Sequence, residues 1–490
     1  MKEWCVEVLW KCLSRLFEAM RTRKLNMERW LIAMLDKKQI LGVTESLCPI
    51  CLKRITAERI QVGEQIYLDK TCGDHGTFRT IIWRGKPSYE SWSVIKLPSR
   101  PPVCATTVNQ GCPFDCGLCP EHRQHTCCVL LEVTKRCNLN CPVCFAEAGT
   151  DEFDPDRKII EKWYRLLLHS GGPYNIQLSG GEPTMRDDLP EIVALGRELG
   201  FSFIQLNTNG LRLAKDPDYV RRLKKAGLSC VFLQFDGTND AIYAKLRGVK
   251  LFAAKQAAIA NCAKEQLGVI LVPTLVPGVN TQNIGHIIEY AIERIPAVRG
   301  VHFQPISYFG RYPQAPKDED RFTIPEVINE LVRQTRGRFN VTDFTAPTGE
   351  NAYCSFHGNF MLMENGKLKT AGKASHGGCC QPQVAAVGAK KAQTFVAKRW
   401  ATPQSVEEQQ GTAQIGSKMN VDSLDAFLER AEKYSFCVSG MAFQDVWNLD
   451  LDRLRDCFIH VVSPDSRIIP FCAYNLTDRQ GKPLYRTWQR

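Results

Sequence analysis

Short apolar runs alternate with segments of helical periodicity between residues 129 and 305. The apolar runs that indicate strands lie at residues 129–133, 174–179, 202–207, 229–235, 268–275 and 300–304. The segments between them, such as residues 159–168 and 189–199, repeat apolar residues at the spacing of a helix. Six strand–helix units predict a parallel, right-handed, curved sheet with helices outside it, which is a partial (β/α)6 barrel of the α/β class. In such a sheet the chemistry lies at the carboxyl ends of the strands.

The chain divides into four predicted parts. Residues 1–43 carry apolar residues at helical spacing with Lys and Arg between them, which predicts an amphipathic helical extension. Such a helix either packs on the domain behind it or lies at a membrane interface. Residues 44–128 are rich in cysteine and predict a small metal-binding module. Residues 129–305 form the predicted barrel, and residues 306–490 predict a cysteine-bearing α+β module.

The cysteine content distinguishes this chain from an ordinary soluble protein. Its 490 residues are 44% hydrophobic and 23% charged, but they include 22 cysteines. No signal peptide is recognisable, and the clustered spacing of the cysteines indicates metal ligation in a reducing cytosol rather than disulfide bonds. No apolar run approaches the roughly 18 residues that a membrane span needs. We therefore expect a cytoplasmic protein, with peripheral membrane contact through the N-terminal helix as the alternative.

The net charge of +11 is spread along the chain. It permits an anionic partner, such as a carboxylate, a phosphorylated substrate or a lipid surface, without requiring one. We predict no nucleic-acid partner.

Three cysteines follow the first predicted strand in one short loop. Cys137, Cys141 and Cys144 have Cys-x3-Cys-x2-Cys spacing, and the aromatic Phe145 follows the last of them. Soft thiolate ligands select iron–sulfur clusters or zinc over hard cations. A four-iron cluster needs four ligands, so three from the protein leave one iron open to another molecule. The alternative is a structural zinc loop, which usually pairs two Cys-x2-Cys elements.

This loop resembles the signature of the radical S-adenosylmethionine (radical SAM) superfamily. The resemblance implies that the open iron of a [4Fe-4S] cluster chelates the amino and carboxylate groups of S-adenosylmethionine. It also implies that an electron from the cluster cleaves this ligand to methionine and a 5′-deoxyadenosyl radical. Cys137, Cys141 and Cys144 would then be catalytic as well as metal ligands. A small electron-transfer protein, ferredoxin or flavodoxin, would be the electron-donating partner.

Residues at the ends of the later strands are candidates for the S-adenosylmethionine site. Residues 179–184, Ser-Gly-Gly-Glu-Pro-Thr, resemble the superfamily element that holds the methionine amine. Glycine lets a backbone approach a ligand closely. A carboxylate side chain can accept hydrogen bonds from an ammonium group, and a guanidinium can donate two hydrogen bonds to a carboxylate. Each of these residues, taken by itself, is as readily explained as a helix cap or turn residue as it is by cofactor binding. The cofactor-binding candidates are Phe145, Gly180, Gly181, Glu182, Pro183, Asn207, Asn209, Gln234, Asp236, Arg247 and Val272.

A separate cysteine knuckle opens the N-terminal module. Cys48 and Cys51 form a Cys-x2-Cys turn in which two thiolates can face one ion, and Cys72 is the third candidate ligand. We expect Cys104 as the fourth ligand, with His75 as its competitor. The ion is zinc or a rubredoxin-like iron, since the ligand types do not decide between them. The alternative is a small core with unmetallated cysteines.

The x3, x2 spacing occurs a second time, just upstream of the main loop. Cys112, Cys116 and Cys119 repeat it, and we expect Cys128, or its neighbour Cys127, as the fourth thiolate of an auxiliary [4Fe-4S] cluster. A fully ligated cluster cannot bind S-adenosylmethionine, so it would serve electron transfer or substrate contact. The alternative is a zinc site that these cysteines share with Cys104.

The longer resemblance, from about residue 44 to 480, is to one branch of the superfamily. This branch includes the archaeal tetraether lipid synthase, and older descriptions of it speak of pterin methyltransferases. Cys379–Cys380 is where a related subgroup of unsettled function carries a Cys-selenocysteine pair. Partly by this resemblance, we expect Cys354, Cys437, Cys457 and Cys472 to hold a further auxiliary cluster, with buried single cysteines as the alternative.

Three functional hypotheses follow. The first is a radical enzyme that abstracts hydrogen and forms a C–C or C–S bond on an unidentified substrate, with lipid as one candidate. The second is a radical methyltransferase or an enzyme that modifies a peptide or thiol. The third is a binding protein that bound metal ions stabilise and that catalyses no reaction.

Overall fold

The structure of the chain is a computed structural model. It describes residues 38–149, 154–312, 314–371, 383–401 and 430–486. The predicted N-terminal amphipathic helix and the pair Cys379–Cys380 lie outside the described residues.

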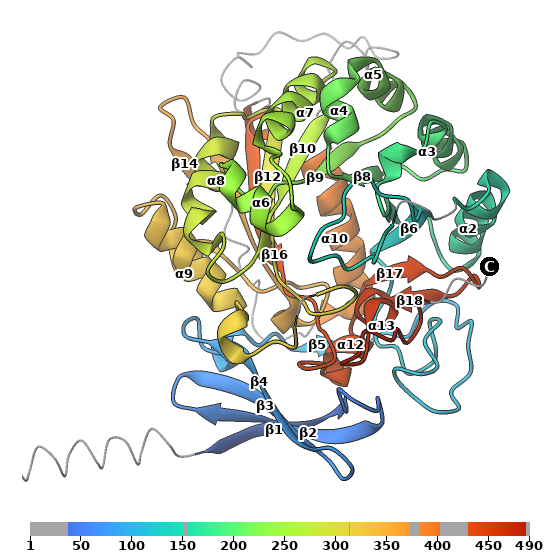
Figure 1. Cartoon of the computed structure of the whole chain (residues 1–490), viewed down its shortest axis with the longest axis vertical. Helices are drawn as coiled ribbons and strands as arrows, with labels where there is room; N and C mark the ends of the chain where they lie inside the picture. The colour runs from blue at the N-terminus through green and yellow to red at the C-terminus, as the bar shows by residue number, and fades with distance from the viewer. Residues whose placement is uncertain (1–37, 150–153, 313, 372–382, 402–429, 487–490) are drawn as a thin grey trace, which may run out of the picture.

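A curved mixed sheet with helices on its convex side forms most of the molecule (Figure 1). Eight neighbouring strands of this sheet are parallel, in the order β16-β12-β10-β9-β8-β7-β6-β17, and the short β11 pairs with β12. The parallel strands are β6 (Cys128–Thr134), β7 (Asn175–Gly180), β8 (Ile204–Thr208), β9 (Cys230–Gln234), β10 (Gly268–Val272), β11 (Thr274–Leu275), β12 (Val298–Pro305), β16 (Ser435–Met441) and β17 (Ile459–Val462). The six strands predicted from residues 129–305 are all present, which confirms the partial barrel.

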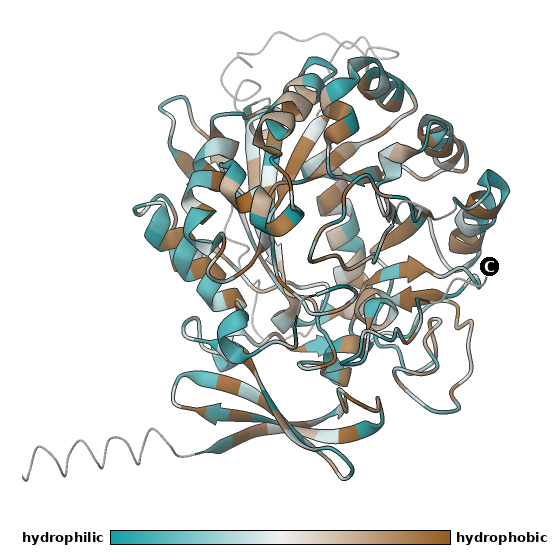
Figure 2. Cartoon of the chain, viewed as in Figure 1, coloured by the Kyte–Doolittle hydropathy of each residue, from teal (hydrophilic) through white to brown (hydrophobic). Residues whose placement is uncertain are grey.

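Helices that follow the strands cover the outer face. In α2, the residues Ile160, Trp163, Tyr164 and Leu167 recur at helical spacing and are buried, and the Asp156 side chain accepts from the Lys158 N–H at the first turn. Figure 2 shows the same division, with hydrophilic residues on the outer sides of these helices. The helices are α2 (Arg157–His169), α3 (Leu189–Glu198), α4 (Leu211–Lys215), α5 (Pro217–Lys225), α6 (Asp240–Arg247), α7 (Phe252–Lys264), α8 (Ile284–Ile292) and α9 (Ile324–Gln334).

The C-terminal part of the chain completes the sheet at both edges. Strand β16 pairs in parallel with β12, and β17 pairs in parallel with β6. Antiparallel strands β13 (Ser355–Leu362), β14 (Leu368–Thr370) and β18 (Ile468–Pro470) then extend the two edges. The predicted C-terminal α+β module is therefore continuous with the barrel sheet. Pairing between residues more than 100 positions apart, as in both of these cases, leaves no local signal in the sequence.

One helix lies on the concave side of the sheet. Helix α10 (Ala385–Trp400) runs through the centre of the curved sheet in Figure 1, and its Trp400 ring lies 4.9 Å from the ring of Phe232 on β9. The Asn175 amide on β7 donates to the Gln393 carbonyl of α10, at 3.0 Å. Immediately before it, β15 (Gln383–Val384) pairs with β5 (Lys96–Leu97). Helix α10 therefore fills part of the barrel interior.

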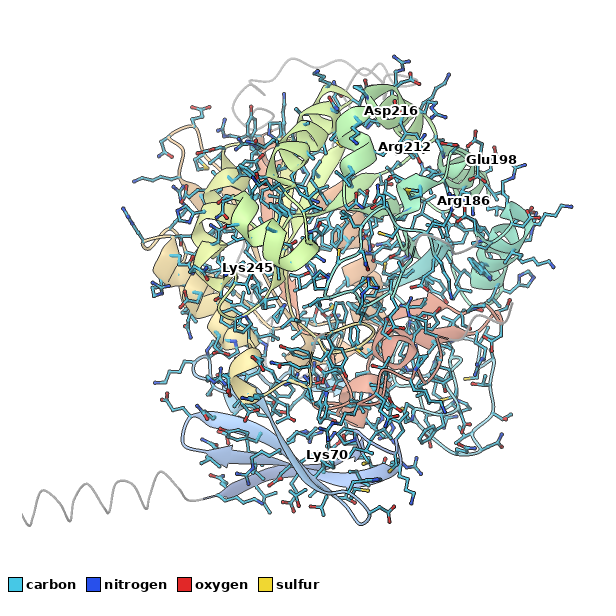
Figure 3. All side chains as sticks on the ribbon, viewed as in Figure 1. Lys70, Arg186, Glu198, Arg212, Asp216 and Lys245 are labelled. Carbon is cyan, nitrogen blue, oxygen red and sulfur yellow. The ribbon has the colours of Figure 1, made fainter. Side chains whose placement is uncertain are left out.

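A four-stranded antiparallel sheet forms the N-terminal module. It consists of β1 (Gln39–Leu47), β2 (Arg54–Val62), β3 (Gln65–Cys72) and β4 (Gly76–Arg84). Figure 3 labels Lys70, whose buried ammonium donates to the Ser46 hydroxyl at 3.0 Å and to the Val446 carbonyl at 2.7 Å. Near this contact are α12 (Leu451–Arg455) and α13 (Phe471–Asn475). Among the described residues, no helix is long and apolar enough to cross a bilayer.

Candidate active site and metal centres

The loop after β6 lies at one end of a large cavity inside the curved sheet. The cavity has a volume of about 520 Å³, and Cys137, Cys141, Cys144 and Phe145 line it. Backbone hydrogen bonds fix the loop at both ends: Cys137 N donates to the Gly149 carbonyl, and Cys144 exchanges two 2.9 Å bonds with Arg311. Burial raises the pKa of the Cys137 thiol to about 12. Three free thiols on one fixed loop are a donor set that fits an iron–sulfur cluster.

The Gly180–Gly181 turn after β7 lies directly against the start of this loop. The Gly181 N–H donates to the Thr134 carbonyl at 2.9 Å, and the Glu182 N–H donates to the Arg136 carbonyl at 2.8 Å. A Cβ on Gly181 would come within 2.7 Å of the Lys135 carbonyl oxygen and closer still to that of Arg136. The glycine is therefore needed because the two backbones touch.

The Glu182 carboxylate braces the strand ends. It accepts from the Thr184 hydroxyl and the Thr208 hydroxyl at 2.6 Å each, and from the Asn209 N–H at 2.6 Å. The side chain is only 1% exposed and borders the cavity. Its first effect is therefore to hold the turn after β7 against the end of β8.

Most of the other cofactor-binding candidates also reach the cavity. Pro183 and Asp236 are buried behind it, where Pro183 begins a short 3-10 helix (Pro183–Met185). The candidates that line it are Phe145, Gly180, Gly181, Glu182, Asn207, Asn209, Gln234, Arg247 and Val272.

Arg247, expected as a carboxylate clamp, is engaged by Asp236. Its Nε and Nη2 donate to the two oxygens of the Asp236 carboxylate at 2.7 and 2.9 Å, and Nη2 lies 3.3 Å from the Thr274 hydroxyl. The Asp236 side chain is fully buried and that of Arg247 is 12% exposed. The pair ties α6 to the ends of β9 and β11, and it leaves the outer face of the guanidinium at the cavity wall.

A buried lysine that the sequence analysis did not single out joins this network. The Lys255 ammonium, from α7, donates to the Asn209 carbonyl at 2.5 Å and to the Gln234 Oε1 at 2.8 Å. Burial lowers the pKa of Lys255 to about 7. An isolated lysine on an amphipathic helix gives no signal of this role.

One part of the cavity wall, formed by β7 and β8, carries uncharged polar side chains, whereas most of the remaining wall is apolar. Alternate residues of neighbouring strands face inward and carry carboxamides: Asn175 and Gln177 on β7, and Gln205 and Asn207 on β8. Within the described part of the chain, the Gln205 Oε1 is buried without a hydrogen-bond partner. Their alternation with buried apolar residues is visible in the sequence, and it was the signal that could have identified this wall.

A histidine lies further down the cavity, opposite the carboxamides. The His302 Nδ1 lies 2.9 Å from the Ser439 hydroxyl, and burial lowers the pKa of His302 to about 4, so the imidazole is neutral. The rings of Phe232 and Trp400 pack beside it, at 5.5 and 6.0 Å between ring centroids.

The N-terminal module holds a compact group of metal-binding side chains. Ligand atoms of Cys48, Cys51, Cys72 and His75 all lie within 4.8 Å of one another. The backbone N–H of Asp74 and the His75 ring lower the pKa of the Cys72 thiol to about 6. Cys104, which we expected as the fourth ligand, is exposed and does not belong to this group. His75, the alternative, is the fourth side chain of the site. The tight turn between β3 and β4 brings His75 to the same side as Cys72. Three thiolates and one imidazole form a common structural zinc set.

Loss of His75 is expected to weaken metal binding at this site. Replacing an outer-shell partner of a metal ligand costs about 10–100-fold in affinity, so the substitution His75→Ala should cost at least tenfold. Competition with a chromogenic chelator measures the affinity. The substitution Cys104→Ser is the matched control and should leave the affinity unchanged. A larger loss in the control than in His75→Ala would contradict this ligand set.

The second cysteine triplet is buried near the base of β17. Cys112, Cys116 and Cys119 line a small cavity together with His122 and Arg455. Neither expected fourth thiolate is there. Cys128 points into the barrel cavity, where its Sγ lies 3.9 Å from the Gln177 Oε1, and Cys127 packs against Met441 and Phe458. Both cysteines line the barrel cavity and neither lines the cavity of the triplet, which corrects both expectations.

Three of the four C-terminal cysteines influence one another's pKa. Burial raises the pKa of Cys472 to about 12, and burial, with smaller contributions from the charges of Cys472 and Cys354, raises the pKa of Cys457 well above its usual value. Arg453 Nη2 lies 3.5 Å from the Cys354 Sγ. The expectation that Cys437 joins them is wrong. It pairs with Asn359 on β13, five residues from Cys354, or about 16 Å at ~3.3 Å per residue.

Comparisons with known proteins agree with this geometry. The family model described as Radical SAM superfamily matches residues 131–291, and that described as HMPTM N-terminal zinc ribbon domain matches residues 40–84. The 7,8-dihydro-6-hydroxymethylpterin dimethyltransferase of Methanocaldococcus jannaschii is 36% identical over 477 residues, covering 89% of this chain and 94% of that protein.

Two further similarities are more limited. The Fe-coproporphyrin III synthase of Methanosarcina barkeri is 40% identical over 162 residues, covering 32% of this chain and 38% of that protein. Among solved structures, SuiB of Streptococcus suis bound to precursor peptide SuiA is 18% identical, with a TM-score of 0.36 and coverage of 44% of this chain and 46% of that chain.

Proposed function

Because the chain belongs to the radical SAM superfamily and is an enzyme, we propose that it activates a C–H bond of a compact, uncharged substrate bound inside the barrel. The observation that carries this proposal is the single cavity that the Cys137 loop shares with the carboxamides of β7 and β8. When bound, the [4Fe-4S] cluster and S-adenosylmethionine supply a 5′-deoxyadenosyl radical. The reactive carbon must therefore lie between the loop and the carboxamide wall.

Different residues of the chain would bind the cluster, bind the cofactor and hold the strand ends in place. Cys137, Cys141 and Cys144 would hold the cluster. Gly180 and Gly181 keep the turn after β7 close enough for its backbone to reach the methionine end of the cofactor. Lys255 and Glu182 hold the ends of β8 and β9 by the hydrogen bonds described above. The polar groups of Asn209 and Gln234 are then fixed at the cavity wall.

The size and polarity of the cavity support a compact substrate. Pockets of ~300–1,000 Å³ accommodate one drug-sized ligand. A volume of about 520 Å³ must hold both the cofactor and the reacting part of the substrate. Carboxamides provide donors and acceptors without charge, and the partnerless Gln205 Oε1 requires an N–H or O–H donor. A neutral nitrogen heterocycle satisfies these conditions better than a phosphate or a long lipid chain.

Methyl transfer to such a heterocycle is the reaction we favour, since this chain is similar to the pterin dimethyltransferase over nearly the whole length of that protein. Hydrogen abstraction from a lipid carbon is the second candidate. The carboxamides of β7 and β8 give it less support, although apolar side chains such as Phe395, Val396 and Trp400 line much of the same cavity. In either case we propose that ferredoxin or flavodoxin delivers the electron, and that auxiliary clusters of the cysteine-rich segments relay it or contact the substrate.

Anaerobic turnover tests the function. The reconstituted chain, with dithionite and S-adenosylmethionine carrying a deuterated methyl group, should release 5′-deoxyadenosine and label 6-hydroxymethyl-7,8-dihydropterin. The triple variant Cys137→Ala, Cys141→Ala and Cys144→Ala should do neither. Absence of 5′-deoxyadenosine from the iron-replete protein would exclude the radical function. 5′-Deoxyadenosine without label in the pterin would exclude only the methyl transfer, and deuterium uptake from a labelled lipid would then favour the second candidate.

A further inference from the structure

Among the described residues, no fourth cysteine lines the cavity of the second cysteine triplet, but an imidazole does. Cys112, Cys116 and Cys119 line a small buried cavity, and His122, three residues after Cys119, lines the same cavity. A turn closes this segment, since the His122 N–H donates to the Cys119 carbonyl at 3.0 Å. The His122 side chain is only 5% exposed. The four side chains thus come from one short, folded segment.

The hydrogen bond of the His122 ring assigns its tautomer. Nε2 lies 2.8 Å from the Cys457 carbonyl oxygen. A carbonyl oxygen can only accept, so Nε2 carries the proton and Nδ1 of the neutral ring carries the lone pair. A ring N–H held by a backbone carbonyl is the arrangement that orients a metal-binding histidine in proteins. The second nitrogen is therefore prepared as a ligand.

The other candidates for the fourth position make other contacts, and the Glu121 carboxylate, which lines the same cavity, accepts from the Cys112 N–H at 3.0 Å. The Cys457 thiol donates to the Ile459 carbonyl at 3.1 Å, and Cys128 faces the barrel cavity. His460 is fully buried and lies 5.0 Å from His122 between ring centroids, but it does not line the cavity of the triplet. Among the described histidines, His122 is the one that lines this cavity, and its tautomer is fixed by the Cys457 carbonyl.

We propose that Cys112, Cys116, Cys119 and His122 together hold an auxiliary iron–sulfur cluster, with the His122 Nδ1 as the fourth ligand. Arg455 lines the same cavity and is held by Glu45 at 2.7 Å, and its positive charge offsets that of the thiolates. A neutral imidazole in place of a thiolate leaves the cluster less negative. Histidine ligation raises the reduction potential of such centres. The site is therefore suited to accept electrons from a donor at lower potential.

Pulsed EPR tests this ligand directly, without substrate or turnover. The full chain carrying Cys137→Ala, Cys141→Ala and Cys144→Ala is loaded with zinc at the Cys48 site, reconstituted with iron and sulfide, and reduced with dithionite. Zinc is EPR-silent, so the His75 nitrogen does not contribute. We expect a strong ¹⁴N coupling, which changes to that of ¹⁵N when the protein is labelled with ¹⁵N-histidine. Absence of the coupling from this parent chain would overturn the proposal.

Substitutions then identify the residue. His122→Cys should abolish the nitrogen coupling, retain the iron content and lower the midpoint potential, whereas His460→Ala should retain the coupling. A coupling that survives in His122→Cys, or disappears in His460→Ala, would overturn the assignment to His122. If His122→Cys fails to fold, as judged by its zinc content and melting temperature, a ¹⁵N-labelled chain in which only His460 is replaced still decides between the two rings. These outcomes do not depend on the proposed catalytic function.

Discussion

Replacing Gly181 with alanine is expected to abolish cleavage of S-adenosylmethionine. The new Cβ would overlap the carbonyl oxygens of Lys135 and Arg136, which begin the cysteine loop. Relief of this overlap must push the loop and the turn after β7 apart. A displacement of about 1 Å at a catalytic site can cost ~10²-fold in rate, so we expect at least a 100-fold loss of 5′-deoxyadenosine formation. The rate is measured on anaerobically reconstituted protein, with iron content determined in parallel.

Gly73→Ala is the matched control for this substitution. A Cβ at Gly73 would meet no atom within 4 Å, and its backbone does not need the left-handed region. This variant should keep its iron and its rate within a factor of about two. Equal activity of the two variants would contradict the close packing of the cysteine loop against the Gly180–Gly181 turn.

Removal of Asp236 is expected to have the largest effect on stability. Asp236→Ala would leave the Arg247 guanidinium without its carboxylate in a nearly buried position. Breaking one side of a buried ion pair typically costs about 3–5 kcal/mol. The double variant Asp236→Leu and Arg247→Leu should recover most of this loss, because no unpaired charge remains. Urea unfolding of zinc-loaded protein measures the free energy of unfolding.

The exposed ion pair on α5 provides the comparison. Asp218 and Arg221 pair at the surface, with side chains 55% and 67% exposed. Asp218→Ala should change the free energy of unfolding by less than about 1 kcal/mol, since exposed pairs contribute little. A similar cost at both positions would show that the Asp236–Arg247 pair is not held in a low-dielectric environment.

The sequence by itself determined the barrel and the cysteine loop after its first strand. Its apolar runs and helical segments are local patterns, so six strands and their order could be predicted without any tertiary contact. The loop with Cys137, Cys141 and Cys144 and the Gly180–Gly181 turn each occupy a few consecutive residues. Parallel strands bring their carboxyl ends together, which is why these separate segments were expected at one site and line one cavity.

Only the tertiary structure decided which cysteines meet. Cys128 follows its triplet closely in the sequence, but the alternation along β6 turns its thiol into the barrel. Cys437 was grouped with Cys354 by residue type, whereas the register of β13 and β16 holds them apart. Spacing within one loop fixes which thiols share a metal, because the chain between them is short. Spacing between distant segments does not, because strand register and side-chain direction then set the distance.

The same reason explains the residues that the sequence left undetected. Strands β16 and β17 join the sheet through pairing with β12 and β6, and α10 enters the barrel from a distant part of the chain. Lys255 contacts Asn209 and Gln234, and His122 contacts the Cys457 carbonyl, only in the folded chain. Local pattern thus predicted that the cysteine loop and the Gly180–Gly181 turn share one site. Long-range packing decided what surrounds it.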